Sequence, residues 1–574
     1  MASISQAYSF LGQFHLQRVS ILAIYNTRNV RNVHDGAIDC SSSKSRMYNP
    51  MLRLPAMAAK ASRYNCRSLR TSSEAAAGAV TAKPSPVRKE SLKEFSEIPG
   101  PSPLPLVGNT LFIVTHKEFD PSNYYKFWGA LVQEYGSIFK LHNIGMPPIV
   151  GTTNPDDIEV FLKSTLENPI RLGFDSLKSV RLRAKDNYFD KKTGLLPENG
   201  DEWWRLRSRV QVPLLRPKNV AMYLPAVDGA TNKFMDRIDL LQAETGQVPA
   251  DFLQELYKWA LECIGLVALN RELGCLEPNI SPDALPVQLI RHVNDLFSAL
   301  NETEMNFHLW KFFRTASYTK LETSHAAFLE LAAGAMREAE ARLEEAKATG
   351  DPDRQLTIME TFLNTEGLSR SDVATMILDM LFAGIDTTSH TVGFALYLLA
   401  RNPEVQRSLQ RQVDAVVRRG EPLTPEHLAA LSCIVNAVKE TLRLYPLTFG
   451  NARVLTHDVV MSGYKVPAGM LAMGFNAVIS RMEEYFPRPL EFLPERWQRD
   501  RPYGAIHPFA SLPFSHGTRM CIGKRLAEQE IYTFLIRMLQ KYTVTFESDE
   551  EMEVKTQLVL KPATQLAFKF HPRN

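Results

Sequence analysis

The sequence predicts a single folded domain that is mainly α with a minor β part. Helical periodicity, with apolar residues recurring every three or four positions, dominates residues 201–348. One apolar helical pattern, residues 368–401, is long enough to cross a whole domain at ~1.5 Å per residue. Alternating apolar and polar residues, which indicate strands, are confined to a few short segments.

The first 85 residues are predicted to be a transit peptide and linker rather than part of this domain. Up to Thr71 the chain has ten Lys and Arg residues, only two acidic residues, and frequent serine. This composition is typical of an organelle transit peptide, and a plain disordered basic tail is the alternative. His15 and Arg18 interrupt the apolar residues 10–25, so we expect no membrane span, which needs roughly 20 mostly apolar residues. Residues 86–574 are then expected to form the domain.

Overall composition is ordinary for a globular protein, with 45% hydrophobic and 22% charged residues. The net charge of +3 predicts no general affinity for polyanions, and the sequence has no nucleic-acid-binding motif. The six cysteines include no CxxC pair. Their sparse spacing argues against a disulfide framework and against a structural zinc site.

The remaining elements follow in chain order. A proline-rich stretch, residues 98–105, predicts a stiff extended segment. Further helices are predicted over residues 127–135, over 431–445, and from Cys521 to about 539, with strands over 137–141, 148–151 and within 542–570. Residues 453–467 predict a strand, a turn and a second strand. Ser369 and Asp372 resemble a capping box at the start of the long helix.

The segment from Phe514 to Gly523 reads Phe-Ser-His-Gly-Thr-Arg-Met-Cys-Ile-Gly. Its glycines let the backbone approach a macrocycle, Phe514 can shield the sulfur of Cys521, and Arg519 can pair with a haem propionate. A helix that starts near Cys521 would direct N–H groups at the sulfur and favour the thiolate. This spacing indicates a thiolate offered to haem iron, although a lone cysteine is most often a buried apolar residue.

Ala383 and Gly384 begin the motif Ala-Gly-Ile-Asp-Thr-Thr in the middle of the long helix. Their small size removes side-chain bulk from one face of the helix. Asp386 and Thr387 beside such a gap suit proton delivery to a ligand bound there. Thr387 can also bond back to a carbonyl and deform the helix locally. By itself, an Asp-Thr pair in a helix is usually incidental.

Glu440 and Arg443 lie three residues apart on a predicted helix, so they face one another. Arg496 could complete a buried network that is structural rather than catalytic, and a surface ion pair of little consequence is the alternative. Trp203 and Arg207 lie one helical turn apart, so both can reach the same haem propionate.

Together these motifs resemble the cytochrome P-450 family from about Ile98 to the C-terminus, and they follow the order of that family. The resemblance implies a triangular, mostly α domain with haem b between the long helix and the helix after Cys521. It implies that Cys521 is the axial ligand of the haem iron and that Asp386 and Thr387 guide protons and water to the distal oxygen. The implied cofactor-binding residues are Trp203, Arg207, Ala383, Gly384, Arg453, Phe514, Arg519, Cys521 and Gly523.

The basic presequence and residues 521–530 are similar to the animal mitochondrial branch of the family. That similarity implies electrons from a small acidic ferredoxin with its NADPH-dependent reductase, at the matrix side of the inner membrane. Lys439, Lys524 and Arg525 are docking candidates, because a basic patch steers an acidic partner. Ordinary solvated charges are the alternative for each of them.

The substrate is expected to be lipophilic, with a sterol-like molecule favoured and a xenobiotic as the alternative. By analogy, residues 287–300 form the helix over the pocket and residues 301–317 the loop beyond it. Leu309, Trp310, Phe312 and Phe313 make that loop apolar, so it could contact a membrane surface or belong to the core.

Two other haem proteins remain open as alternatives. A haem-thiolate isomerase or dehydratase would rearrange lipid peroxides without O2 or a reductase, and Asp386 with Thr387 argues against it. A non-catalytic haem carrier or sensor would also leave this acid and alcohol pair without a role.

Overall fold

The computed structural model describes residues 91–120, 123–305, 308–349 and 354–573. The chain divides into two units, Met1–Val87 and Arg88–Asn574. The predicted transit peptide and linker, residues 1–85, lie outside the described residues.

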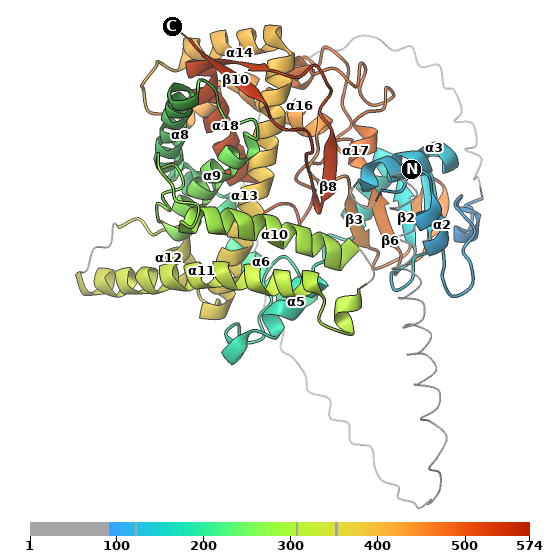
Figure 1. Ribbon diagram of the computed structural model, residues 1–574. Helices are drawn as coiled ribbons and strands as arrows, with labels where there is room; N and C mark the ends of the chain where they lie inside the picture. Colours follow the sequence, from blue (N-terminus) through green and yellow to red (C-terminus); the bar gives the residue numbers. More distant parts are fainter. Residues whose placement is uncertain (1–90, 121–122, 306–307, 350–353, 574) are drawn as a thin grey trace, which may run out of the picture. The chain divides into compact units, whose positions relative to one another are not determined.

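Helices make up most of the described chain, as the sequence predicted (Figure 1). In the first half they are α2 (Thr110–Thr115), α3 (Tyr124–Tyr135), α4 (Pro155–Ser164), α5 (Asp175–Leu182), α6 (Gly200–Leu215), α7 (Pro217–Ala221), α8 (Leu224–Thr245), α9 (Leu253–Ile264) and α10 (Leu285–Met305). In the second half they are α11 (Ala316–Thr349), α12 (Ile358–Leu363), α13 (Arg370–Arg401), α14 (Pro403–Val416), α15 (Pro425–Ala430), α16 (Ser432–Leu444), α17 (Asn476–Ile479) and α18 (Lys524–Lys541). Short helical turns lie at η1 (Phe95–Glu97), η2 (Lys185–Asn187), η3 (Gly265–Leu269), η4 (Leu309–Lys311) and η5 (Pro494–Trp497).

The β part consists of one four-stranded sheet and three two-stranded ribbons among the described residues. In the sheet, β1 (Ile138–Leu141), β2 (Ile149–Thr152), β6 (Leu471–Gly474) and β3 (Asn451–Val454) lie side by side in this order. β2 and β6 are parallel, and the other two pairs are antiparallel. The ribbons pair β4 (Val459–Met461) with β5 (Tyr464–Val466), β7 (Tyr542–Phe546) with β10 (Phe568–Pro572), and β8 (Val554–Gln557) with β9 (Val559–Pro562).

The prediction of one strand, turn and strand over residues 453–467 was wrong in part. The hairpin is β4–β5 alone, whereas Arg453 lies in the separate strand β3, which pairs with β6. The predicted loop over residues 301–317 is also shorter, because α10 continues to Met305. Local alternation could not show which strands pair, since strand pairing depends on a distant segment of the chain.

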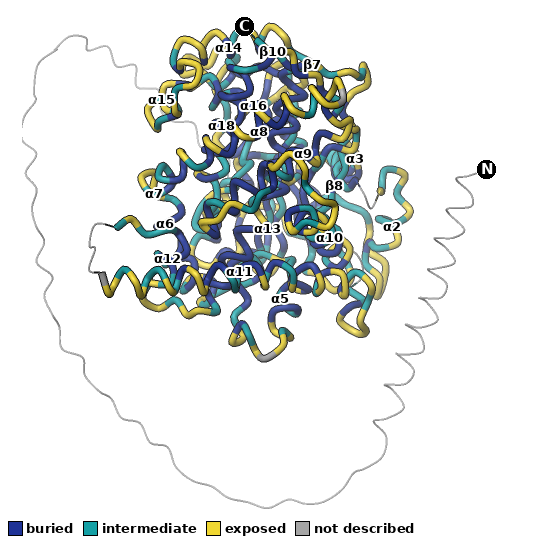
Figure 2. Tube along the Cα trace, turned by 60° about the vertical axis from the view of Figure 1, so that its left-hand side comes forward, coloured by how far each residue is buried: buried dark blue, intermediate teal, exposed yellow. Residues whose placement is uncertain are grey.

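The long helix α13 runs through the centre of the helical part and is buried along most of its length (Figures 1 and 2). It begins at the predicted capping box, where the Ser369 hydroxyl accepts from Asp372 N and the Asp372 carboxylate accepts from Ser369 N. Helices α9, α11, α16 and α18 pack against it. A helix so enclosed can position a side chain at depth, which is what a buried site requires.

Candidate functional site

The loop before α18 holds Cys521 in a fixed turn. Cys521 N donates to the carbonyl of Phe514 at 2.9 Å, which closes the loop. Gly517 has φ +81°, a backbone conformation that favours glycine, and a Cβ there would lie 2.4 Å from the Leu166 side chain. Gly523 is the N-cap of α18, so the helix begins at Lys524, three residues after Cys521. The turn therefore presents the thiol at a helix N-terminus, as the sequence predicted.

Cys521 is accessible, although many protein atoms lie close to its side chain. The residue is exposed, yet burial raises the pKa of its thiol. The Gly523 N–H and the charges of Arg207, Arg171 and Lys524 lower this pKa but do not outweigh burial. The N–H at the helix start therefore favours the thiolate, as the sequence predicted, but desolvation outweighs it in the net pKa of Cys521.

The face of α13 that carries the acid and alcohol pair is interrupted. Ala383 is exposed and Gly384 and Thr387 are half-buried, whereas their flanking residues are buried. The Thr387 hydroxyl donates to the Ala383 carbonyl at 2.6 Å, which is the back-bond expected from the sequence. A Cβ on Gly384 would lie 3.0 Å from Ile264. Because Gly384 has no side chain, the end of α9 can pack closely against it. The open surface of α13 lies at Ala383 and Thr387.

Asp386 is buried and one of its carboxylate oxygens, Oδ1, has no hydrogen-bond partner. Burial raises its pKa to about 7, and the charge of Lys561 on β9 acts in the opposite direction. One turn later His390 hydrogen-bonds to the Tyr257 hydroxyl at 2.8 Å, and burial lowers the pKa of His390 to about 3. An acid that titrates near neutral pH therefore lies next to Thr387.

Four arginines from separate segments gather beside the Cys521 loop. Arg207 on α6 donates to the carbonyl of Met520, the residue before the cysteine, at 3.0 Å. The Arg519 guanidinium lies 4.9 Å from the ring of Trp203, which is also on α6. The other two are Arg453 on β3 and Arg171 in the segment between α4 and α5.

The charges of these arginines are not balanced within the protein. Burial, together with the neighbouring arginines, lowers the pKa of Arg519 to about 8 and that of Arg453 to about 10. Burial likewise lowers the pKa of Arg207 to about 10. The Nε atoms of Arg171, Arg207 and Arg519 are buried without a partner. Since isolated buried charges are costly, this cluster fits a ligand that carries carboxylates.

Nearby acids do not fill that role. Glu198 pairs with Lys178 at 2.9 Å, and Asp379 pairs with Arg181 at 2.7 Å. Arg171 was missed by the sequence reasoning. It lies outside any regular element, and no flanking motif marks it, so only the folded arrangement reveals it.

A second buried cluster is complete without a ligand. Glu440 accepts from Arg443 at 2.7 Å, from Arg496 at 3.2 Å and from the Trp497 indole at 2.8 Å. Arg443 also donates to three backbone carbonyls of the segment that leads to η5. Glu440, Arg443 and Arg496 are the side chains expected from the sequence to form a structural network, and the Trp497 indole joins them. They join α16 to the segment around residues 480–497.

The sequence pattern of the family Cytochrome P450 matches residues 98–570. The chain belongs to this family. Similar proteins are "Probable cytochrome P450 49a1" of Drosophila melanogaster, 35% identical over 80% of each chain, and "Cytochrome P450 CYP12A2" of Musca domestica, 32% identical over 84% of this chain and 91% of the relative. "Cytochrome P450 12b1, mitochondrial" of Drosophila acanthoptera is 30% identical over 82% of this chain and 88% of the relative.

Members of the cytochrome P450 family are monooxygenases that bind haem b through a cysteine thiolate. The site fits this cofactor, because haem carries two propionates and the arginine cluster lacks an anion. Among the described residues, every helix of this cytochrome P450 is too short or too polar to cross a bilayer.

The predicted docking residues of this cytochrome P450 lie on one surface. Lys524 lies 5.6 Å from the ring of Phe514, in the cysteine loop. Burial lowers the pKa of Lys439 most, and the charges of Arg501 and Lys524 lower it further. Arg525 is exposed, and Lys524, Arg525 and Lys439 all act on the pKa of Glu528. The three cations are therefore neighbours beside the Cys521 loop.

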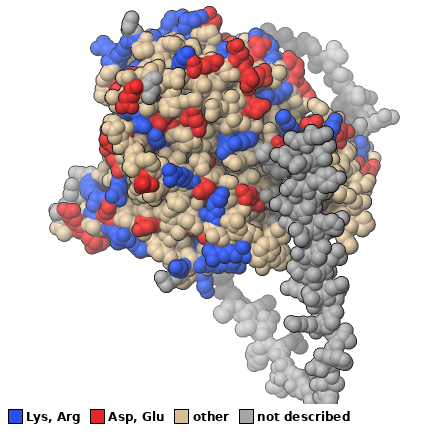
Figure 3. All heavy atoms as spheres, in the orientation of Figure 1, with Lys and Arg blue, Asp and Glu red and all other residues tan. Residues whose placement is uncertain are grey.

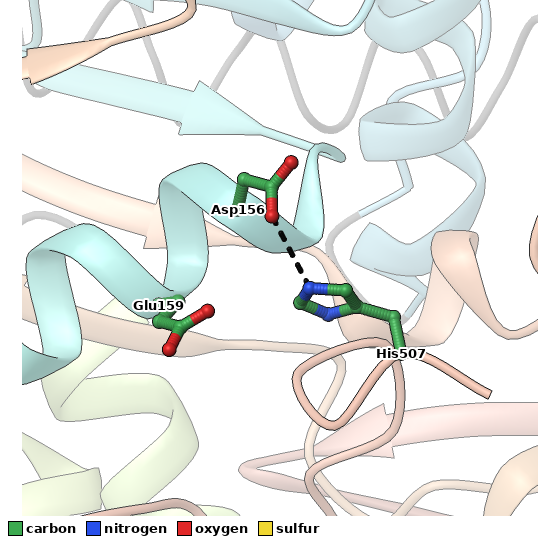
Figure 4. A group of neighbouring side chains, drawn as sticks. All are labelled: Asp156, Glu159 and His507. Carbon is green, nitrogen blue, oxygen red and sulfur yellow. Dashed lines mark ion pairs between the residues drawn. The ribbon is translucent and has the colours of Figure 1, made fainter. Parts of the chain in front are cut away.

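Asp156, Glu159 and His507 form a separate group on the surface of this cytochrome P450 (Figure 4). His507 Nδ1 accepts from the N–H of Phe509, and His507 Nε2 lies 3.2 Å from Asp156 Oδ1. Glu159 is paired with Lys163. The Phe509 N–H thus occupies one imidazole nitrogen, and the group is a polar contact between α4 and the segment before the cysteine loop.

Proposed function

We propose that this protein is a mitochondrial haem-thiolate monooxygenase that hydroxylates a lipophilic, sterol-like molecule with electrons from a ferredoxin. The observation that carries the proposal is the pairing of two features: a cysteine loop bordered by unbalanced arginines, and an open patch on α13 next to an acid and an alcohol. Residues 1–85 are proposed as transit peptide and linker, and residues 86–574 as the haem domain.

In this proposal Cys521 is the axial ligand of the haem iron, and the four arginines hold the propionates. Arg207, Arg453 and Arg519 are buried and Arg171 borders them, so each charge–carboxylate contact would form away from water and be strong. Iron coordination would remove the thiol proton that burial retains. When bound, haem with a thiolate ligand supplies the activation of O2 that hydroxylation needs.

Asp386 and Thr387 are proposed to control protons on the other side of the site. Asp386 has a pKa of about 7, so it can both accept and release a proton near neutral pH. The hydroxyl of Thr387 donates to Ala383, which leaves its oxygen lone pairs able to accept from a water. Ala383 and Thr387 together keep this part of α13 open for substrate and water.

The reduced protein under carbon monoxide tests the ligand assignment. We expect the Soret band of a thiolate-bound haem in the wild-type protein and in Cys433→Ser, and its loss in Cys521→Ser. Cys433, half-buried on α16, is the matched control. Absence of the band from the wild type, or its retention in Cys521→Ser, would overturn the assignment. Turnover of a lipid hydroperoxide without ferredoxin would favour the isomerase or dehydratase instead.

The surface formed by Lys439, Lys524 and Arg525 is proposed to bind the ferredoxin. Its position beside the Cys521 loop supports this role, because electrons would enter near the sulfur. Lys524→Glu is expected to raise the KM for ferredoxin and to weaken its dependence on salt, while the substrate-induced spectral shift stays unchanged. Lys569→Glu on β10, an exposed lysine paired with Glu547, is the control. An unchanged KM in Lys524→Glu would contradict the docking role.

The turn after α10 is proposed to contact the mitochondrial membrane from the matrix side. Phe312 and Phe313 are 76% and 57% exposed, and they line a surface pocket of about 350 Å³ with Arg183, Lys311 and Arg314. Basic side chains gather along the lower edge of the face in Figure 3. Aromatic rings beside cations suit an interface with anionic lipids. Trp310 is buried, so it belongs to the core instead.

Titration of a sterol library against the ferric protein addresses the substrate. A spectral shift with sterols and none with polar xenobiotics would support the sterol-like proposal, and the reverse pattern would support a detoxifying role.

A further inference from the structure

Two neighbouring tryptophans on α6 connect the inside of the protein to its surface. Trp203 is 2% exposed and Trp204 is 46% exposed, and their ring centroids are 6.1 Å apart. Trp204 alone among the six tryptophans, all of which are described, is exposed. One exposed aromatic side chain needs no explanation by itself. The pair is of interest because of what its inner member contacts.

The inner end of the pair lies among the groups that border the cysteine loop. The Arg519 guanidinium lies 4.9 Å from the Trp203 ring. Arg207, one turn along α6 from Trp203, donates to the carbonyl of Met520, next to Cys521. If these arginines hold the propionates, as in the proposed function on which this inference rests, Trp203 is the aromatic ring at the edge of the cofactor.

The surroundings of the two rings differ. The buried Arg519 guanidinium lies over the Trp203 ring, and the buried Arg207 lies one turn further along α6. Trp204 is exposed, with the exposed Asp201 three residues earlier and Arg207 three residues later on the helix. A positive charge on an indole is disfavoured near buried cations, where the effective dielectric constant is low, and is better tolerated in water. Solvent at Trp204 can also accept the indole proton, so an oxidising equivalent on Trp203 moves outward.

We propose that Trp203 and Trp204 form an electron relay that discharges the haem site when oxidant is made there without a substrate to consume it. Trp203 would give one electron to the oxidised haem site and would take one electron from Trp204. Trp204 then loses its Nε1 proton to water and becomes a neutral radical. A soluble thiol or ascorbate returns one electron and one proton, which restores the indole.

The relay is tested on the ferric holoenzyme mixed with hydrogen peroxide in the absence of substrate. Freeze-quenched samples carrying ring-deuterated tryptophan are examined by electron paramagnetic resonance, and tryptic peptides are examined for oxidised tryptophan. We expect a tryptophan radical and oxidation at Trp204 in the wild type. Trp204→Phe should lose this radical and lose its Soret absorbance faster than the wild type. Trp310→Phe, remote from α6 in sequence and buried, should match the wild type.

Protein whose iron is blocked with an azole distinguishes the relay from oxidation that follows from exposure alone. Trp204 is equally exposed in that protein. Oxidation of Trp204 only in the unblocked protein supports the relay. Equal oxidation of Trp204 in the blocked protein, or Soret absorbance that decays no faster in Trp204→Phe than in the wild type, overturns it. The carbon monoxide spectrum of the same preparations tests the proposed function separately. A normal thiolate spectrum without a Trp204 radical would contradict only the relay.

Discussion

Two buried clusters of charge differ in whether the protein completes them. In the cluster around Glu440, one carboxylate accepts from two arginines and an indole, and Arg443 also donates to backbone carbonyls. In the cluster around Arg207, Arg453 and Arg519, cations lie near one another and buried Nε atoms have no partner. Both clusters are rich in arginine, but only the first is balanced.

The difference separates a structural role from a binding role. A buried ion is stable only with a partner of opposite charge or with full hydrogen bonding. Where the chain provides that partner, the cluster holds elements of the fold together. Where it does not, the partner is a bound molecule, and the sign of the unbalanced charge indicates its chemistry. Here the excess of cations indicates a molecule with carboxylates.

The largest expected effect comes from removing the anion of the balanced cluster. Glu440→Ala leaves Arg443 and Arg496 buried without their carboxylate, which should lower the free energy of unfolding by roughly 3–5 kcal/mol. Chemical denaturation of the purified protein measures this. Glu404→Ala, which breaks an exposed pair with Arg407, should change little. A Glu440→Ala variant as stable as the wild type would remove the distinction between the clusters.

Asp386 extends the comparison to an unbalanced acid. Its folded pKa of about 7 lies above the ordinary 3.8, so between these values the folded state binds more protons than the unfolded state. Stability is therefore retained at low pH and lost as pH rises through this window, by up to about 4 kcal/mol. In Asp386→Asn this loss should vanish.

Melting temperatures of both proteins from pH 5 to 8 provide the measurement. His390 titrates in the opposite sense, since its pKa is lowered to about 3, but it is present in both proteins and cancels in their difference. Parallel pH profiles would show that Asp386 is not the responsible group.

A smaller effect is expected from removing one unbalanced cation. Arg453→Met should weaken haem retention by about 1.5–3 kcal/mol, the range for a hydrogen bond to a charged group. Because it also removes a repelling charge, the haem-free protein should become more stable. Arg181→Met provides the contrast, since Arg181 is buried but paired with Asp379, and its loss should destabilise both forms. Haem transfer to apomyoglobin and melting of the haem-free protein distinguish these outcomes.

Features specified by neighbouring residues could be predicted from the sequence. The capping box at Ser369 and the contact of Glu440 with Arg443 each depend on residues three apart on one helix, and the structure contains both. The long helix begins and ends within two residues of its predicted limits.

Features that depend on distant segments could not be predicted in this way. Arg171 joins the arginine cluster from an irregular segment, and Arg453 lies in a strand whose partner is β6. Lys561 acts on Asp386 from a ribbon near the C-terminus. The net pKa of Cys521 also depends on how much protein surrounds it, which no local motif encodes.

The unbalanced arginines have a consequence for the life of the polypeptide. A newly made chain without haem must keep mutually repelling cations together in its interior, which lowers the stability of its folded state and leaves more of the chain unfolded and open to proteases. Binding of the cofactor relieves that repulsion and stabilises the fold by mass action. The amount of enzyme would then follow the supply of haem, with degradation removing the chains that fail to acquire it.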